Sequence, residues 1–204
     1  MQEYISLGRM LLVTNNQTKP QFHLPHHWVE KPDSKSTKLR IVFDGSAKST
    51  SGASLNDLLL LAGPPIQPKI FNILLRFRLF KVAVCADIKM HRCVRITPPD
   101  QFLQCILWRE NPRARNKTYS SDTVTYGTKP AAFLAIHTMQ QLTYNEEHNF
   151  PLAAKIIRLD FYVDDLISGG DSIEEASKIR HQKIQVTWRY LRLATFSVQV
   201  QRFY

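Results

Sequence analysis

Two adjacent carboxylates, Asp164 and Asp165, lie between the runs 159–163 and 166–170, an arrangement that predicts the turn of a tight hairpin. Neighbouring like charges repel, so each carboxylate resists ionisation unless a cation or a hydrogen-bond network lies between them. Mg²⁺ or Mn²⁺ would supply that cation, because both prefer carboxylate oxygens. The alternative is an ordinary solvated turn, since Asp is frequent in turns for structural reasons alone.

A third carboxylate, Asp87, follows Ala83-Val84-Cys85-Ala86 in an apolar run, residues 81–88, that is typical of a buried strand. An ionised side chain there is costly unless it is paired or bound to a metal. One carboxylate on a strand and two on a hairpin form the set that two-metal phosphoryl transfer requires. A capping or salt-bridged Asp at a strand end is the simpler alternative for Asp87.

The elements that would position these carboxylates alternate between strands and helices. Ser54 and Asp57 form a capping-box pattern that predicts a short helix before Gly63. Further strands are expected at residues 39–44, 102–108 and 118–126. Further helices are expected at residues 66–77, 130–148 and 172–190. The strands 102–108 and 118–126 are joined by a basic stretch that contains Arg109, Arg113, Arg115 and Lys117, where a hairpin loop is expected.

The composition is that of a globular chain with a strongly basic balance. Of its 204 residues, 44% are hydrophobic and 22% are charged, which excludes disorder throughout. Lys and Arg number 27 against 17 Asp and Glu, and the resulting charge of +10 favours a polyanionic partner such as nucleic acid. A membrane surface is the competing partner, although no apolar run approaches the roughly 20 residues that span a bilayer.

Cysteine usage favours a reducing compartment. Cys85, Cys93 and Cys105 are odd in number and lack the spacing of a zinc site or of a disulfide framework. The first residues show no progression from basic to apolar to small, as a signal peptide would. We therefore expect an intracellular protein, cytoplasmic or nuclear, without a membrane partner.

The segment Phe161-Tyr162-Val163-Asp164-Asp165 resembles the YxDD box of reverse transcriptases. Other segments, in the same order along the chain, resemble the reverse transcriptase domain of BEL/Pao long-terminal-repeat retrotransposons. The resemblance covers roughly residues 4–182, and its motifs lie at residues 24–32, 39–47, 54–57, 74–78, 86–88, 106–109, 123–128 and 151–154.

The resemblance implies an α+β fold, the fingers and palm of a right-hand polymerase, with an antiparallel palm sheet flanked by helices and no thumb. Residues 1–80 would form the fingers-like part and the start of the palm, and residues 81–182 the palm with the catalytic carboxylates. Residues 183–204 would be a divergent or truncated tail. The partners implied are an RNA or DNA template-primer, deoxynucleoside triphosphates, and the missing thumb, ribonuclease H and integrase regions of the polyprotein.

The resemblance also assigns roles to single residues. Asp87, Asp164 and Asp165 would be the catalytic ligands of Mg²⁺ or Mn²⁺. The residues that would bind the incoming nucleotide are Lys31, Arg40, Ile88, His91 and Gly127. Tyr162 would touch the primer end. The structural alternatives are a solvated basic edge for the two cations, a strand terminator for Gly127, and a ring that covers the sheet for Tyr162.

Two departures from the family pattern bear on activity. The segment after Asp87 is one residue shorter than usual and has His91 in place of an aromatic residue, which predicts damaged nucleotide selection. Ala132 stands where the family commonly has Pro, and the tail shows no clear match. Three interpretations follow: a reverse transcriptase fragment, a non-catalytic nucleic-acid-binding remnant, and an inert transposon relic.

Overall fold

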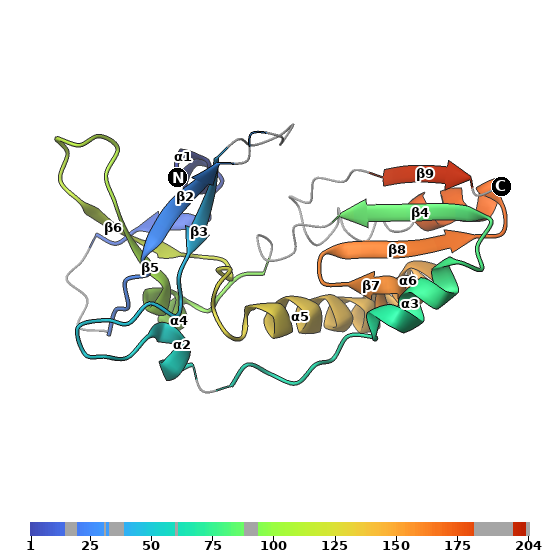
Figure 1. Ribbon diagram of the computed structural model, residues 1–204, viewed down its shortest axis with the longest axis horizontal. Coiled ribbons are helices and arrows are strands. Elements are labelled where there is room, and N and C mark those ends of the chain that lie inside the picture. The colour runs from blue at the N-terminus through green and yellow to red at the C-terminus, as the bar shows by residue number, and fades with distance from the viewer. Residues whose placement is uncertain are drawn as a thin grey trace. The chain divides into compact units, whose positions relative to one another are not determined.

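The computed structural model describes residues 1–14, 20–30, 32, 39–59, 61–87, 94–181 and 198–202. These residues form two compact units, shown in Figure 1. Unit 1 comprises Met1–Gly63 and Val94–Ala131, and unit 2 comprises Pro64–Cys93 and Ala132–Tyr204. Both combine helices with antiparallel sheets, which confirms the α+β class. The assignment of fingers, palm and tail to particular residue ranges stays a prediction.

Unit 1 contains a three-stranded and a two-stranded sheet, both antiparallel. The first has the strand order β1 (Met10–Leu12), β6 (Lys117–Ser121) and β5 (Cys105–Trp108), and the second pairs β2 (His26–Glu30) with β3 (Leu39–Phe43). Its helices are α1 (Gln2–Ser6), α2 (Leu55–Leu58), α4 (Pro98–Gln101) and the 3₁₀ helix Phe102–Gln104. The buried side chains of Met10, Phe43, Ile106 and Tyr119 join the two sheets in one core.

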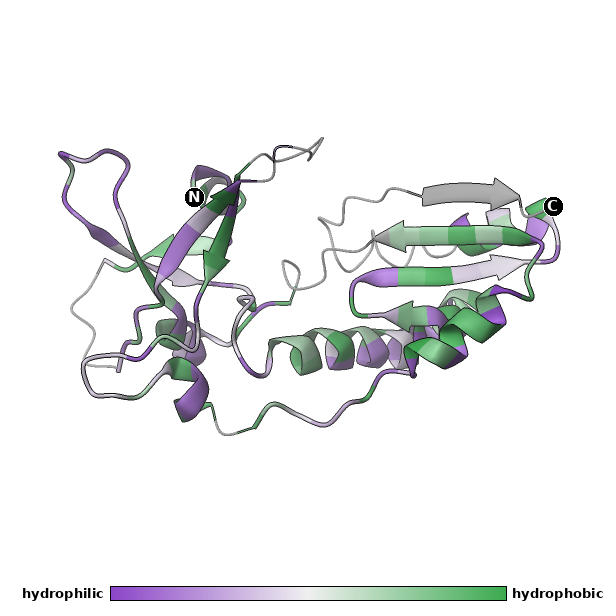
Figure 2. Cartoon of the chain, viewed as in Figure 1, coloured by the Kyte–Doolittle hydropathy of each residue, from purple (hydrophilic) through white to green (hydrophobic). Residues whose placement is uncertain are grey.

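Unit 2 is built on a four-stranded antiparallel sheet. Its strand order is β7 (Phe161–Tyr162), β8 (Asp165–Gly170), β4 (Val82–Asp87) and β9 (Val198–Arg202). Its helices are α3 (Ile70–Phe77), α5 (Ala131–Glu146), α6 (Pro151–Asp160) and the helix at residues 173–181. Figure 2 shows that β4 is apolar along most of its length. Because β4 lies between β8 and β9, this apolar sequence suits an inner strand.

One face of this sheet is covered by helices. Val84 of β4 and Leu166 of β8 are each 1% exposed and pack against buried side chains from α5, α6 and residues 173–181. The helical partners are small or branched, with Ala135, Met139, Ala153, Ile156, Ile157, Ala176 and Ile179 in the same cluster. This core fixes which face of the sheet is buried and therefore where the strand ends lie.

Several expected elements are confirmed, with shifts at their ends. The strand expected at 39–44 is β3, the strand at 81–88 is β4 as far as Asp87, and the helix at 130–148 is α5. The capping box of α2 is confirmed: the Ser54 hydroxyl accepts from the Asp57 N–H, and the Asp57 carboxylate accepts from the Ser54 N–H. The Ser54 N–H and the Ser54 hydroxyl both donate to the Asp57 carboxylate, and these two hydrogen bonds lower the pKa of Asp57.

Other expectations were wrong in detail. Residues 102–104 of the expected strand 102–108 form a 3₁₀ helix, the strand expected at 118–126 ends at Ser121, and the helix expected at 66–77 begins only at Ile70. The helix expected at 172–190 is described only over residues 173–181. In the tail, residues 198–202 form β9, which the sequence did not predict. Among the described residues, no helix combines the length and apolarity needed to cross a membrane.

In unit 1 a cluster of polar contacts closes the turn around Gly127. The Asn56 amide nitrogen donates to the Gly127 carbonyl at 2.9 Å, and its oxygen accepts the Lys129 N–H at 2.7 Å. Gly127 has a φ of +90°, and an added Cβ would lie 2.4 Å from the carbonyl oxygen of Phe43. The missing side chain therefore allows the backbone after β3 to touch this turn.

We predict that Gly127→Ala destabilises unit 1 by more than the roughly 1–3 kcal/mol that an unfavourable positive φ costs, because the methyl group also strikes backbone. Gly52→Ala is the matched control: Gly52 has a φ of +83°, but an added Cβ would meet nothing within 4 Å. Urea denaturation of both variants measures the difference. Equal losses of stability would contradict the close contact at Gly127.

Candidate functional site

The two adjacent carboxylates lie at the β7–β8 hairpin, as the sequence predicted. Tyr162 pairs with Asp165, so Val163 and Asp164 form a two-residue turn. Asp165 is the first residue of β8 and is exposed, whereas Asp164 and Tyr162 are half-buried. The first strand is shorter than expected, because residues 159–160 belong to α6.

Strand pairing brings the third carboxylate of the predicted set to the same place. In the antiparallel ladder of β4 and β8, Asp87 lies directly opposite Asp165. Residues opposite each other in such a ladder lie on one face of the sheet, with Cα atoms about 5 Å apart. The last residue of β4 therefore lies beside the first residue of β8 and next to the turn that carries Asp164.

The donor set is composed of carboxylates alone, which suits a hard cation such as Mg²⁺ or Mn²⁺. The Asp87 side chain lies outside the described part of the structure. Among the side chains that are described, no three His, Cys, Asp or Glu residues lie close enough together to hold a metal ion. Two observations therefore support a metal site: the backbone pairing of Asp87 with Asp165, and the preference of hard cations for carboxylate oxygens.

The turn that carries Asp164 has an unfavourable backbone conformation at Val163. Val163 has a φ of +54° and is the one non-glycine residue with a positive φ in the described part of the chain. A β-branched residue rarely adopts this conformation, which costs of order 1–3 kcal/mol and persists only where its surroundings hold it. The Val163 N–H donates to Oε1 of Gln67 at 3.1 Å, from the segment before α3.

A second contact holds the other side of the hairpin. Asp160, the last residue of α6, is 6% exposed, and its carboxylate accepts hydrogen bonds from Arg76 Nε at 3.0 Å and from the Ser168 hydroxyl at 2.7 Å. Arg76 also donates to the carbonyl of Leu159. Because Arg76 belongs to α3 and Ser168 to β8, one buried carboxylate connects α3, α6 and the strand that begins with Asp165.

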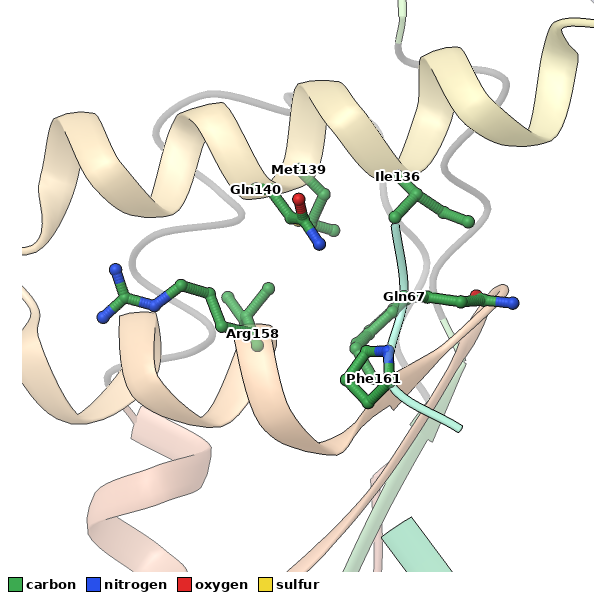
Figure 3. A pocket seen from close by; sticks show the side chains of 8 residues that line it. Gln67, Ile136, Met139, Gln140, Arg158 and Phe161 are labelled. Atoms are coloured by element: carbon green, nitrogen blue, oxygen red, sulfur yellow. The ribbon is translucent and has the colours of Figure 1, made fainter. Parts of the chain in front are cut away.

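A shallow hollow lies on the helical side of this hairpin (Figure 3). It has a volume of about 260 Å³, which includes open solvent, and it is lined mainly by apolar side chains from α5, α6, β7 and the segment before α3. Gln67 and Gln140 supply its amide groups. Arg158, at its rim, pairs with Glu147, and this contact lowers the pKa of the Glu147 carboxyl.

The residues predicted to bind the nucleotide fall into two groups. Arg40 and Gly127 belong to unit 1, and the Arg40 guanidinium lies 5.7 Å from the ring centroid of Tyr126. Lys31, Ile88 and His91 lie outside the described residues. The structure thus brings together the backbone positions of the carboxylates in unit 2. A shared site of these carboxylates with Arg40 and Gly127 stays a prediction.

Sequence reasoning missed the side chains that hold the hairpin in place. Asp160 could have been recognised from the sequence, because it is a lone charged residue between Leu159 and Phe161; the sequence pattern places it in a strand, whereas it ends a helix. Nothing in the sequence marks Gln67, because its contact with Val163 joins residues that are distant along the chain.

The thiol of Cys105 is not a candidate nucleophile, because burial raises its pKa to about 11 and keeps it protonated.

No family model matches the sequence, and no curated protein matches it either. Solved structures do match. A foamy viral protease-reverse transcriptase in complex with double-stranded DNA has a TM-score of 0.69 and 18% identity, over 98% of this chain and 30% of that one. The same kind of protein with an RNA/DNA hybrid has a TM-score of 0.65 and 18% identity, over 97% of this chain and 22% of that one.

A mutant of the prototype foamy virus protease-reverse transcriptase gives a TM-score of 0.68 at 18% identity, over 97% of this chain and 22% of that one. Matches at this level of identity establish the fold alone. The chain therefore has a reverse-transcriptase-like fold, and it spans less than a third of the length of these neighbours.

The contact between Arg76 and Asp160 yields a prediction for stability. Asp160→Ala should lower the free energy of unfolding by about 3 kcal/mol, because it removes the carboxylate that accepts from Arg76 Nε and from the Ser168 hydroxyl. Asp171→Ala removes an exposed carboxylate from the same unit and should change stability little. Chemical denaturation of both variants measures the effect, and a small loss for Asp160→Ala would contradict a structural role of this carboxylate.

Proposed function

We propose that this chain is a reverse-transcriptase-type nucleotidyltransferase, an RNA-directed DNA polymerase fragment related to BEL/Pao retrotransposons. The observation that carries the proposal is the pairing of Asp87 with Asp165 beside the Asp164 turn, on a reverse-transcriptase-like fold. The ordered motifs of the sequence support the retrotransposon origin. We further propose that it acts inside the cell, in the cytoplasm or nucleus.

Asp87, Asp164 and Asp165 would hold Mg²⁺ or Mn²⁺ at the end of the palm sheet. When bound, such ions activate an attacking hydroxyl and stabilise a departing pyrophosphate. The protein contributes rigid placement: β4 and β8 carry two of the carboxylates, and the hairpin turn carries the third. Placement of this kind supplies much of the catalysis in phosphoryl transfer.

The remaining roles follow the resemblance. Arg40 and Lys31 would bind the triphosphate of the deoxynucleotide, because a guanidinium offers a planar fork and an ammonium a point charge to phosphate oxygens. Ile88 and His91 would lie under the sugar, Gly127 would leave room for the nascent base pair, and Tyr162 would touch the primer. A template-primer is the macromolecular substrate, and a longer polyprotein would supply the thumb, ribonuclease H and integrase.

Primer extension on an RNA template with Mg²⁺ tests this proposal. Asp164→Asn should reduce incorporation at least about a hundredfold, because losing a ligand charge removes several kcal/mol of transition-state stabilisation. Asp171→Asn makes the same chemical change at an exposed position of unit 2 and should leave incorporation unchanged. Incorporation that survives Asp164→Asn, or none from folded wild-type protein at any concentration, would contradict the catalytic assignment.

A second candidate function, nucleic-acid binding without catalysis, is favoured by the loop between β5 and β6. Arg109, Arg113, Arg115 and Lys117 are all exposed, and within the described residues none of them is paired with a carboxylate. The loop is mainly hydrophilic (Figure 2). Residues 109–116 contain none of the large apolar side chains that membrane-surface binding needs, and the unpaired cations suit a phosphate backbone.

The backbone of this loop is turned by a side chain of the loop itself. The Asn111 side-chain oxygen accepts the N–H groups of Arg113 and Ala114, at 3.0 and 2.9 Å, so the backbone between the cations is already turned. An ordered loop loses less conformational entropy on binding than a flexible one. Contacts of these cations with phosphates would not depend on base sequence, because the phosphate backbone is the same for every base.

Arg113→Gln with Arg115→Gln should reduce the slope of log affinity against log salt by about two for an RNA–DNA hybrid, since two phosphate contacts are lost. The control, Lys155→Gln with Arg180→Gln, removes the same charge from exposed helix positions and should leave the slope unchanged. Binding is measured in EDTA, so catalysis plays no part. Equal effects of both pairs would show that only net charge matters and would contradict a binding site on the loop.

A further inference from the structure

The conformation of the turn that carries Asp164 depends on a side chain far away in the sequence. Val163 adopts its φ of +54° at the first turn position, which in a type II′ hairpin normally belongs to glycine. Valine resists this conformation, so some contact must offset its preference for negative φ. The Val163 N–H donates to Oε1 of Gln67 at 3.1 Å, which fixes the orientation of this peptide group.

The backbone next to Gln67 is hydrogen-bonded to a helix of the same unit. The Gln140 side chain of α5 donates from Nε2 to the carbonyl of Ile66 at 2.8 Å. Figure 3 shows Gln140 extending from α5 into the hollow and the Gln67 amide at the tip of the hairpin. Two hydrogen bonds therefore connect α5, through residues 66–67, with the turn at Val163.

We propose that Gln67 is a positioning residue for the metal-binding hairpin: it holds Val163 at positive φ and so directs Asp164 and Asp165 to the end of β4. Without this acceptor the turn relaxes toward negative φ, and the carboxylates leave their places opposite Asp87. The consequence for metal binding rests on the proposed function, whereas the effect on the turn does not.

The surroundings of Gln67 predict a local effect of its substitution and not a general loss of stability. Gln67 is half-buried and lines a hollow that is open to solvent. A substituted side chain leaves no closed cavity there, and water can reach the freed groups. Gln67→Leu is therefore expected to fold normally and to change the turn alone.

Two readouts without catalysis test the proposal: hydrogen exchange of the amides in residues 161–166 other than residue 163, whose own acceptor is removed, and the affinity for Mn²⁺ measured by electron paramagnetic resonance. Gln67→Leu keeps the size of the side chain but removes its acceptor, so exchange at the turn should rise about tenfold and Mn²⁺ affinity should fall about tenfold. Gln67→Glu retains an acceptor oxygen and should restore slow exchange. Because it adds a charge, only the exchange readout is used for this variant.

Two controls separate positioning from general destabilisation. Gln141→Leu changes the neighbouring glutamine of α5, which bonds within its own helix to Asn145, and should leave the turn unchanged. Gln140→Leu should shift both readouts in the same direction as Gln67→Leu, by a smaller factor. In a Val163→Gly background, where positive φ is no longer unfavourable, Gln67→Leu should have little further effect.

The proposal is overturned if Gln67→Leu leaves turn exchange unchanged, if Gln67→Glu exchanges as fast as Gln67→Leu, or if Val163→Gly does not remove the dependence on Gln67. Failure of the proposed function gives a different result. In that case neither the wild type nor any variant binds Mn²⁺ at the hairpin, while the exchange measurements still decide the role of Gln67.

Discussion

The antiparallel pairing of β4 with β8 sets the place of every carboxylate in the candidate site. Six residue pairs join the strands, from Val82 opposite Gly170 to Asp87 opposite Asp165. A shift by one residue would expose the buried side chains of the ladder and separate the two carboxylates. Gly169 adds a steric constraint, because a Cβ there would lie 2.4 Å from the Val82 carbonyl oxygen. Side-chain packing thus fixes the register of β4 against β8, and this register places Asp87 opposite Asp165.

The hairpin that carries the carboxylates is fixed at both of its sides. Asp160 connects its base to α3 and to Ser168 of β8, and Gln67 holds its turn. Both contacts use polar side chains where packing alone cannot define an orientation. A backbone conformation that valine disfavours is thereby kept next to Asp164. Such conformations concentrate at functional sites, which agrees with the proposed role of this hairpin.

The sequence predicted local features better than distant contacts. The capping box at Ser54 and the strand that ends with Asp87 were read correctly, because capping and apolar patterning act over a few residues. The hairpin at Asp164 and Asp165 was predicted from the runs that flank it, which is also a local pattern. The helix end at Asp160 and the strand at residues 198–202 were missed, because tertiary packing and strand pairing decide them. The contact of Gln67 with Val163 was likewise invisible in the sequence.

Anomalous diffraction from crystals grown with Mn²⁺ would locate the metal and is the sharpest test of the proposed site. An anomalous peak is expected at the end of β4 and β8, with the carboxylate oxygens of Asp87 and Asp164 about 2 Å from the ion and Asp165 beside it. No peak at the hairpin at millimolar Mn²⁺, or a peak held only by other residues, would contradict a metal site built by the pairing of β4 with β8.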